Sequence, residues 1–385
     1  MRRSRDWILT THTGSLPRPA DLDQLIADRE TGAGVDQAEF GKRVAEAVAD
    51  IVASQLAAGV SVISDGEMGR ASYVSYVKDR LSGFAGPGRR LTVTEMAQYP
   101  EVFEPIARDP AVARMMSQPA CDGPVSLRDP DAVRTDIANL KNAVREAEPA
   151  DVFMSAASPG LIAAFLANEY YASDEEYIFA LADAMKPEYD AIAAAGLVLQ
   201  LDCPDLAITR ALPGNEALSD AELRDQIRLH VRALNHAVRD IPPEQMRMHV
   251  CWGNGEWPHV TDAPLAAIID VVLEARPAGL AFEAASPRHE HEWTVWKDVR
   301  LPDGKILMPG VIDSTTNVVE HPELVAQRIV RLAEVVGRES VIASTDCGFG
   351  TLAGFYPVKP RVTWLKLSAM ADGAQIASEY LWKRG

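Results

Sequence analysis

The chain has 385 residues, and its 38 Lys plus Arg against 55 Asp plus Glu give a formal net charge of −17. Such an acidic chain offers little basic surface for phosphate groups, which argues against a nucleic-acid-binding protein. The apolar fraction of 47% with 24% charged residues is typical of a folded globular protein and excludes a disordered one. No apolar run approaches the ~18 residues of a membrane span, and none resembles a signal peptide, so we expect a cytoplasmic protein with no membrane partner.

Short β-branched or apolar runs alternate with longer segments of helical period along the chain. Apolar residues recur every three to four positions in 40–56 and in 325–336, which predicts helices there. The strand candidates, in chain order, are 8–12, 60–64, 121–127, 151–155, 197–202, 246–251, 279–283, 305–310 and 340–345. The third is a weak candidate because Gly123 and Pro124 interrupt it.

Strands that alternate with helices predict an α/β protein with a parallel sheet, and eight such strands close a (β/α)8 TIM barrel. No repeat or long linker divides the chain, so we expect one domain over 1–385. Residues 68–120 are too many for one crossover and are predicted to form a mostly helical excursion after the second strand. The alternative is an open doubly wound sheet. It would need a glycine-rich phosphate turn after the first strand, and the Thr13-Gly14-Ser15 turn is not one.

Reactive side chains follow most of the predicted strands at the point where each strand ends. In a barrel these ends and the loops after them converge on one concave face. Strand ends that served only packing would be apolar, so the pattern predicts a site at this face. The residues concerned are His12, Thr13, Ser15, Asp65, Glu67, Asp202, His249, Cys251, Glu283, Asp313, Asp346 and Cys347.

The strongest local signal is the sequence His249-x-Cys251. Residues two apart on a strand leave the same face, so the imidazole and the thiolate can bind one ion. Zn²⁺ accepts sulfur, nitrogen and carboxylate oxygen tetrahedrally, and Glu283 and Cys347 at later strand ends would complete the set. The alternative is a core histidine beside inert buried thiols. The four cysteines are too scattered for a disulfide framework.

The motifs resemble those of the cobalamin-independent methionine synthase family, in its smaller single-domain members, over nearly the whole chain. They are TTHTGSLPRP at 10–19, SDGE at 64–67, LQLDCPDLA at 199–207, HVC at 249–251, FE at 282–283, PGVID at 309–313 and STDCGFGT at 344–351. The resemblance implies zinc-dependent transfer of a methyl or alkyl group to a thiol, with His249, Cys251, Glu283 and Cys347 as ligands. It also implies that Ser15, Glu67 and Asp202, with Thr13 beside them, hold the amino and carboxyl ends of homocysteine.

Chemistry supports this reading, because coordination to zinc lowers the pKa of a thiol and presents the thiolate that attacks carbon. Glu283 is the ligand expected to be displaced most easily as the substrate sulfur enters. Glu67 and Asp202 suit an ammonium group, although carboxylates at strand ends also commonly cap the next helix.

The sequence departs from the family where the long methionine synthases have a histidine, shortly after the turn that carries Asp313. That histidine protonates the folate leaving group, and Thr315 stands near its place here. We predict catalytic roles for Asp202 and Asp313, and we predict that His289 or His291 supplies the missing proton, since imidazole titrates near neutral pH. The alternative for these two histidines is a solvated helix start.

The first functional hypothesis is therefore methyl transfer to homocysteine or a related thiol. The rival is a zinc thiol alkyltransferase that resembles the epoxyalkane:coenzyme M transferases. A third, from another class, is a zinc- or thiol-binding protein without turnover. The expected partners are a small-molecule thiol and a methyl or alkyl donor, and the sequence leaves a homo-oligomer open.

Overall fold

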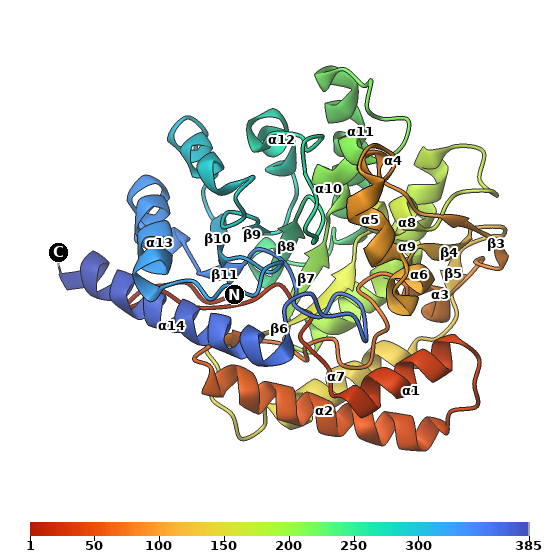
Figure 1. Ribbon diagram of the computed structural model, residues 1–385, viewed down its shortest axis with the longest axis horizontal. Coiled ribbons are helices and arrows are strands. Elements are labelled where there is room, and N and C mark those ends of the chain that lie inside the picture. Colours follow the sequence, from red (N-terminus) through yellow and green to blue (C-terminus); the bar gives the residue numbers. More distant parts are fainter. Residues whose placement is uncertain (384–385) are drawn as a thin grey trace.

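Seven parallel strands form the central sheet of the computed structural model, which describes residues 1–383 (Figure 1). Their order in the sheet follows their order in the chain, as in a barrel wall. In that order they are β1 (Val62–Ile63), β6 (Asp151–Ala157), β7 (Val198–Asp202), β8 (Met246–Val250), β9 (Gly279–Phe282), β10 (Ile306–Ile312) and β11 (Ser344–Thr345). The predicted α/β barrel architecture is confirmed.

The predicted first strand, 8–12, lies between β11 and β1 but is not a regular strand. Thr11 N donates to Ala343 O at 2.8 Å, and Val62 N donates to Thr10 O at 2.9 Å, so the segment joins both edges of the sheet. Side-chain hydroxyls replace part of the ladder, because Thr10 N donates to Ser61 Oγ at 2.8 Å and Ser61 N to Thr10 Oγ1 at 3.0 Å. The segment therefore closes the barrel with a single bridge, Thr10 to Ala343.

Helices cover the outer face of the sheet. The helix α2 (Gln37–Ala57) precedes β1, and its first turn is capped by Asp36, which accepts from Ala38 N and Glu39 N. The remaining helices around the barrel are α1 (Ala20–Glu30), α7 (Asp131–Ala143), α8 (Pro159–Phe165), α9 (Asp174–Ala194), α10 (Asp205–Ile208), α11 (Asp220–Ala237), α12 (Leu265–Val272), α13 (Pro322–Val336) and α14 (Pro360–Lys383). Short 3₁₀ segments are η1 (Thr209–Ala211), η2 (Pro243–Gln245), η3 (Glu290–Lys297) and η4 (Arg338–Ser340).

The predicted excursion after the second strand, 68–120, contains more helix than strand, but its strands also form two antiparallel ladders that the sequence analysis did not predict, one of them with β5 just beyond residue 120. One ladder pairs β2 with β5, and the other pairs β3 with β4. The weak strand candidate 121–127 contributes only β5 and lies outside the barrel sheet. The elements are α3 (Val77–Arg80), β2 (Leu81–Ser82), β3 (Gly86–Arg90), α4 (Thr94–Gln98), α5 (Pro100–Ala107), α6 (Pro110–Met115), β4 (Ser117–Ala120) and β5 (Ser126–Leu127).

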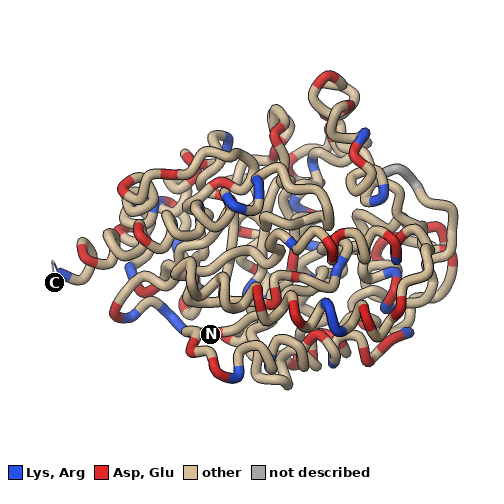
Figure 2. The backbone as a smooth tube through the Cα atoms, turned by 60° about the horizontal axis from the view of Figure 1, so that its bottom comes forward, with Lys and Arg blue, Asp and Glu red and all other residues tan. Residues whose placement is uncertain are grey.

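The hydrophobic core has two parts. The larger lies between the helices and the sheet. The smaller fills the barrel interior with side chains from neighbouring strands, among them Phe153, Ala281 and Met308, all fully buried. In the view of Figure 2, Lys and Arg are interspersed with Asp and Glu along the chain. Within residues 1–383, none of the helices combines the length and the hydropathy that crossing a bilayer requires.

Candidate active site at the carboxyl ends of the strands

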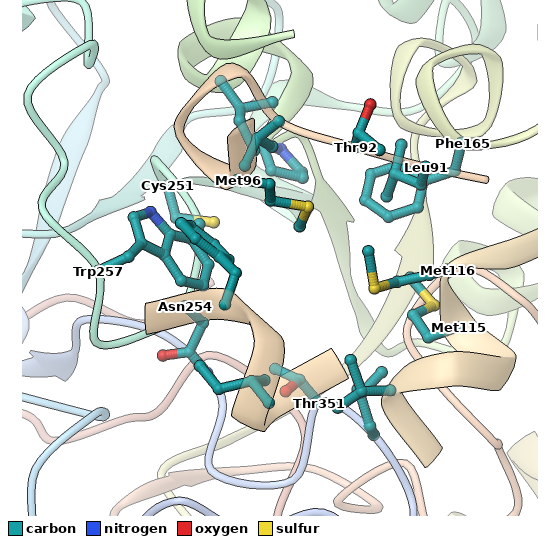
Figure 3. A pocket seen from close by; sticks show the side chains of 18 of the residues that line it. Leu91, Thr92, Met96, Met115, Met116, Phe165, Cys251, Asn254, Trp257 and Thr351 are labelled. Atoms are coloured by element: carbon teal, nitrogen blue, oxygen red, sulfur yellow. The ribbon is translucent and has the colours of Figure 1, made fainter. Parts of the chain in front are cut away.

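A cavity of about 780 Å³ lies at the carboxyl ends of the strands. Its floor includes residues from the predicted strand ends, among them Asp202 at the end of β7 and His249 in β8. These two residues are direct neighbours in the parallel ladder. Its walls come from the excursion and from the loops after β8 and β11, as Figure 3 shows.

Three of the four predicted metal ligands meet at the floor of this cavity. The ligand atoms of His249, Cys251 and Cys347 all lie within 4.8 Å of one another, and all three residues are buried. The first two project from one face of the chain at the end of β8, as their spacing predicts. Cys347 comes from the loop directly after β11, on the other side of β9 and β10.

The three side chains fit a soft metal ion. Neither nitrogen of His249 has a hydrogen-bond partner among the described residues, although both are buried. An imidazole left in this state is costly unless a ligand occupies one nitrogen. The pKa of Cys251 is held well below its usual range, because the Cys347 thiol donates a hydrogen bond to it and His249 lies close by. The set of one imidazole and two thiols is the chemistry that zinc prefers.

The fourth predicted ligand, Glu283, lies close by but outside this 4.8 Å group. Its Oε1 accepts a hydrogen bond from Trp252 N at 3.0 Å. Burial, together with the negative charge of Cys251, raises the pKa of Glu283 well above its ordinary value. Its carboxylate is therefore a group that gains from a nearby cation.

Asp346 positions this part of the site, a role that the sequence analysis missed. Its Oδ1 accepts from Ala284 N at 2.8 Å and from Ala285 N at 2.9 Å, which ties the loop after Glu283 to the loop that carries Cys347. Burial raises the pKa of Asp346 to about 7.

Asn254 and Ser314 also hold Cys347 in place. Ser314 Oγ donates to Asn254 Oδ1 at 2.8 Å and accepts from Cys347 N at 3.1 Å. Asn254 Nδ2 donates to Gly348 O at 2.8 Å. The only signal for these two residues in the sequence was their proximity to predicted strand ends.

Glu67 lines the cavity from a strained backbone conformation. It is a non-glycine residue at φ 59°, a region that such residues rarely adopt and that clusters at functional sites. Its Oε1 accepts from Ser155 Oγ at 2.7 Å, whereas its buried Oε2 has no hydrogen-bond partner among the described residues. Gly14 makes this placement possible, since a Cβ at that position would lie 2.7 Å from Glu67 Oε1.

Asp202 lines the same cavity, as do Thr13 and Ser15. Gln200 Nε2 donates to Asp202 Oδ1 at 2.9 Å. Burial, and then the nearby charge of Glu67, raise the pKa of Asp202 well above its ordinary value. The Thr13 hydroxyl donates to Thr345 O at 3.1 Å, which anchors the loop that also carries Ser15.

His289 and His291 are not positioned as proton donors. His289 does not line the cavity, because its Nδ1 contacts Glu292 Oε2 and its Nε2 contacts Asp262 Oδ2, both at 2.9 Å. Its ring also stacks on Trp252, with ring centroids 4.0 Å apart. His291 is exposed and lies outside the cavity. The geometry therefore gives no support to the expectation from the sequence for this pair.

Asp313 is likewise turned away from the cavity lining. Its carboxylate accepts from the backbone and hydroxyl groups of Thr315 and Thr316, at distances from 2.6 to 2.9 Å. Desolvation raises its pKa, but these hydrogen bonds outweigh that effect and leave the pKa lowered. Asp313 shapes the turn after β10, which gives no support to the predicted catalytic role.

The apolar wall of the cavity was not anticipated from the sequence. Around the predicted metal ligands lie methionine and aromatic side chains, most of them from the excursion (Figure 3). They come from short segments without a clear period, so nothing in the local pattern indicates which side chains face the cavity. The main contributors are Leu91, Met96, Phe103, Met115, Met116, Phe165 and Trp257.

A TIM barrel with imidazole, thiol and carboxylate groups converging at the carboxyl ends of its strands has the architecture of a barrel enzyme, and three of these groups could hold a metal ion. The family model described as cobalamin-independent synthase, catalytic domain, matches residues 8–108 and 161–374. The chain belongs to this family, and the prediction of a methionine-synthase-type methyltransferase is confirmed.

Similar proteins cover nearly the whole chain. A methionine synthase of Thermococcus kodakarensis is 25% identical over 98% of this chain and 95% of its own length. A methionine synthase of Saccharolobus islandicus is 26% identical over 98% and 96%. The crystallised B12-independent methionine synthase of Shewanella sp. W3-18-1, in complex with selenomethionine, has the same fold, with a TM-score of 0.72, 20% identity and coverage of 98% and 99%.

Proposed function

We propose that this protein transfers a methyl group to the thiol of homocysteine at a zinc ion held by His249, Cys251 and Cys347. The observation that carries the proposal is the pair of buried, unpartnered nitrogens of His249 beside two thiols. Family membership gives the reaction class, and the names of the curated relatives suggest the acceptor. Zinc supplies Lewis-acid chemistry that keeps a bound thiol deprotonated near neutral pH.

Glu283 is the proposed fourth ligand. Its carboxylate lies near Cys251 and is held by one hydrogen bond, from Trp252 N. A carboxylate is a harder ligand than a thiolate, so with a metal bound Glu283 would be the most weakly held of the four ligands. The hydrogen bond from Trp252 N would orient the Glu283 carboxylate whether or not it binds the ion.

Glu67 and Asp202 are the proposed anchors of the amino-acid end. Both are buried carboxylates at the cavity, and neither forms an ion pair within 4.0 Å with any described side chain. A substrate ammonium between them would relieve the repulsion that raises the pKa of Asp202. Thr13 and Ser15, on the facing loop, are proposed to hold the carboxyl end.

The test is calorimetric titration of homocysteine into zinc-loaded and metal-free protein, in two buffers that differ in ionisation enthalpy. We expect binding only to the zinc-loaded form, with release of about one proton per thiol bound. Homoserine, which has a hydroxyl in place of the thiol, is the matched ligand control and should release none. Equal homocysteine affinity with and without zinc, or no release of protons, would refute the proposal.

The coenzyme M rival is not carried forward. Its acceptor bears a sulfonate, which needs a basic partner, and no Lys or Arg occurs among the described residues that line the cavity. Coenzyme M therefore serves as a second acceptor in the same titration, where we expect much weaker binding than for homocysteine.

A further inference from the structure

The residues that line the cavity indicate which kind of methyl donor it can bind. Between the excursion and the loop after β8 the cavity is lined mainly by apolar side chains (Figure 3). Met96 and Phe103 come from α4 and α5, and Trp257 comes from the loop after β8, with its ring centroid 5.5 Å from that of Phe103. Phe165 at the end of α8 meets Tyr73 edge-on at 5.8 Å. Such a wall favours a donor with an apolar body, and the aromatic rings of the wall can offer their faces to that donor.

The charge of the cavity has one sign. Its described lining holds four carboxylates, Glu67, Glu104, Asp202 and Glu216, and no Lys or Arg. Glu104 is partly balanced by Arg108, which lies outside the lining at 3.5 Å, and Glu216 accepts from Thr94 Oγ1 at 2.6 Å. The buried Oε2 of Glu67 has no hydrogen-bond partner in the part of the chain that the structure describes. A donor with several carboxylates, such as a folate polyglutamate, meets no counter-charge among the described lining residues, whereas a cation is attracted by the carboxylates and by the aromatic faces.

The cavity also lacks an acid suited to protonate a leaving group. His249 is the one histidine in the described lining, and it belongs to the proposed metal site. Burial raises the pKa of Tyr73 well above its ordinary value of 10.0, so its hydroxyl is a weak acid at neutral pH. Glu67 and Asp202 are occupied by the substrate ammonium in the proposed function. The other two carboxylates of the lining, Glu104 and Glu216, are exposed to solvent, and the hydrogen bond from Thr94 lowers the pKa of Glu216. The donor must therefore release its methyl group without taking a proton.

We propose that the methyl donor is a sulfonium compound with an apolar body. This inference rests on the proposed function, since it takes the homocysteine thiolate as nucleophile. The thiolate sulfur attacks the methyl carbon and forms the new S–C bond. The old C–S⁺ bond breaks, and its electron pair stays on the donor sulfur. The products are methionine and a neutral thioether, so charge balances and no proton is needed.

The first experiment compares three donors with zinc-loaded protein and homocysteine. They are hexyldimethylsulfonium, the neutral hexyl methyl ether and 5-methyltetrahydropteroyltriglutamate, each with a deuterated methyl group, and labelled methionine is measured by mass spectrometry against a protein-free blank. We expect turnover with the sulfonium to exceed that with either other donor by about 10² or more. Faster transfer from the folate or the ether overturns the inference. So does the absence of any transfer from the sulfonium, provided that homocysteine still binds. Loss of homocysteine binding itself is instead a failure of the proposed function.

The second experiment changes the charge of the wall without touching the metal or amino-acid anchors. Met96→Lys places a cation in the half-buried wall, and Met96→Leu is the matched neutral control. We expect Met96→Lys to weaken hexyldimethylsulfonium binding by about tenfold or more because like charges repel, while Met96→Leu leaves it nearly unchanged. Zinc content and homocysteine affinity check that both variants are folded. Unchanged sulfonium binding in Met96→Lys, or tighter binding, would exclude a cationic donor at this wall.

Discussion

Two groups of buried polar side chains lie on the same face of the barrel and differ in how they are satisfied. The first, the cavity cluster, consists of His249, Cys251, Cys347, Glu67 and Asp202. Both nitrogens of His249 and one oxygen of Glu67 lack partners among the described residues. All five residues line the cavity.

The second group, the histidine–carboxylate cluster, consists of His259, Asp262, His289 and Glu292. Asp262 Oδ2 contacts His259 Nδ1 and His289 Nε2, each at 2.9 Å. Glu292 contacts His289 Nδ1 at 2.9 Å and accepts from Leu265 N at 2.7 Å. His289 has a carboxylate at each nitrogen, and a neutral imidazole carries only one N–H, so the arrangement favours the protonated ring and raises the pKa of His289.

The comparison distinguishes polar side chains that bind a ligand from polar side chains that stabilise the fold. Both groups contain histidine and carboxylates near strand ends, so residue type alone does not distinguish them. A buried polar atom without a partner is costly and persists where a ligand completes it, whereas a fully bonded cluster stabilises the fold. The predictions below test this distinction, from the largest expected effect to the smallest.

Loss of a thiol from the cavity cluster should have the largest effect. We expect Cys251→Ser and Cys347→Ser each to weaken zinc binding and to abolish turnover. Loss of a residue that only hydrogen-bonds a metal ligand weakens metal binding by roughly 10- to 100-fold, and loss of a ligand itself should weaken it more. The matched control is Cys203→Ser, because Cys203 is a buried thiol outside the cavity. Zinc is measured by mass spectrometry of dialysed protein. Full zinc content in the double variant would contradict the metal assignment.

Removal of one charge from the anchors should have the next largest effect. Glu67→Gln or Asp202→Asn should weaken homocysteine binding by about 1 to 3 kcal/mol, because each loses a charge-assisted hydrogen bond to the ammonium. A thiol without the ammonium should be affected much less. Asp205→Asn is the control, since Asp205 is bonded to Ser158 and His230 and lies outside the cavity. Equal effects on both thiols would make the two anchors structural.

His289→Asn should lower stability and leave methyl transfer unchanged. The variant leaves Asp262 and Glu292 short of a partner, at a cost of about 1 to 3 kcal/mol in the free energy of unfolding. Burial lowers the pKa of His289, but the hydrogen bonds to Asp262 and Glu292 outweigh it and raise the pKa above 6.5. The stabilisation is thus complete below the unfolded pKa and is lost as the pH rises through the folded pKa.

Denaturant unfolding across the neutral range measures this effect. The difference in unfolding free energy between the wild type and His289→Asn should shrink as the pH rises. A difference that grows with pH, or a fall in turnover by about 10² at unchanged zinc content, would restore a catalytic role for His289.

The smallest effect is expected for the exposed neighbour. His291→Asn should change stability by no more than about 0.5 kcal/mol and leave turnover unchanged, because its side chain is exposed and outside the cavity. Thermal unfolding and a standard activity assay check this. A marked loss of activity would show that the burial and the hydrogen-bond partners of a side chain do not tell whether it serves binding or the stability of the fold.

The sequence predicted the parts of the site that depend on local geometry. The spacing of His249 and Cys251 fixes a common face on any strand, and a residue after a buried strand of a parallel barrel lies at the site. For that reason Glu67, Asp202 and Cys347 are also found at the predicted place. Family motifs then added the chemistry.

The remaining features depend on contacts between distant segments. His289 is turned inward by Asp262, which precedes it by 27 positions, and no pattern around His289 indicates that contact. The methionines of the wall lie on short helices whose orientation follows from their packing over the barrel mouth. The segment 8–12 reads as a strand, but hydroxyls of Thr10 and Ser61 take over ladder hydrogen bonds there.

The closure of the barrel by residues near 10 sets the order in which the protein can mature. The bridging partner of Thr10 is Ala343, and Thr13 bonds to Thr345 across 332 positions of the chain. At a synthesis rate of about 5 to 20 residues per second, the first of these segments waits roughly 20 to 60 s on the ribosome for the second. Ser15 and Cys347 lie in the loops that follow these two segments. In the growing chain, the proposed zinc ligands Cys251 and Cys347 can therefore meet at one site only after the last barrel segment has been made.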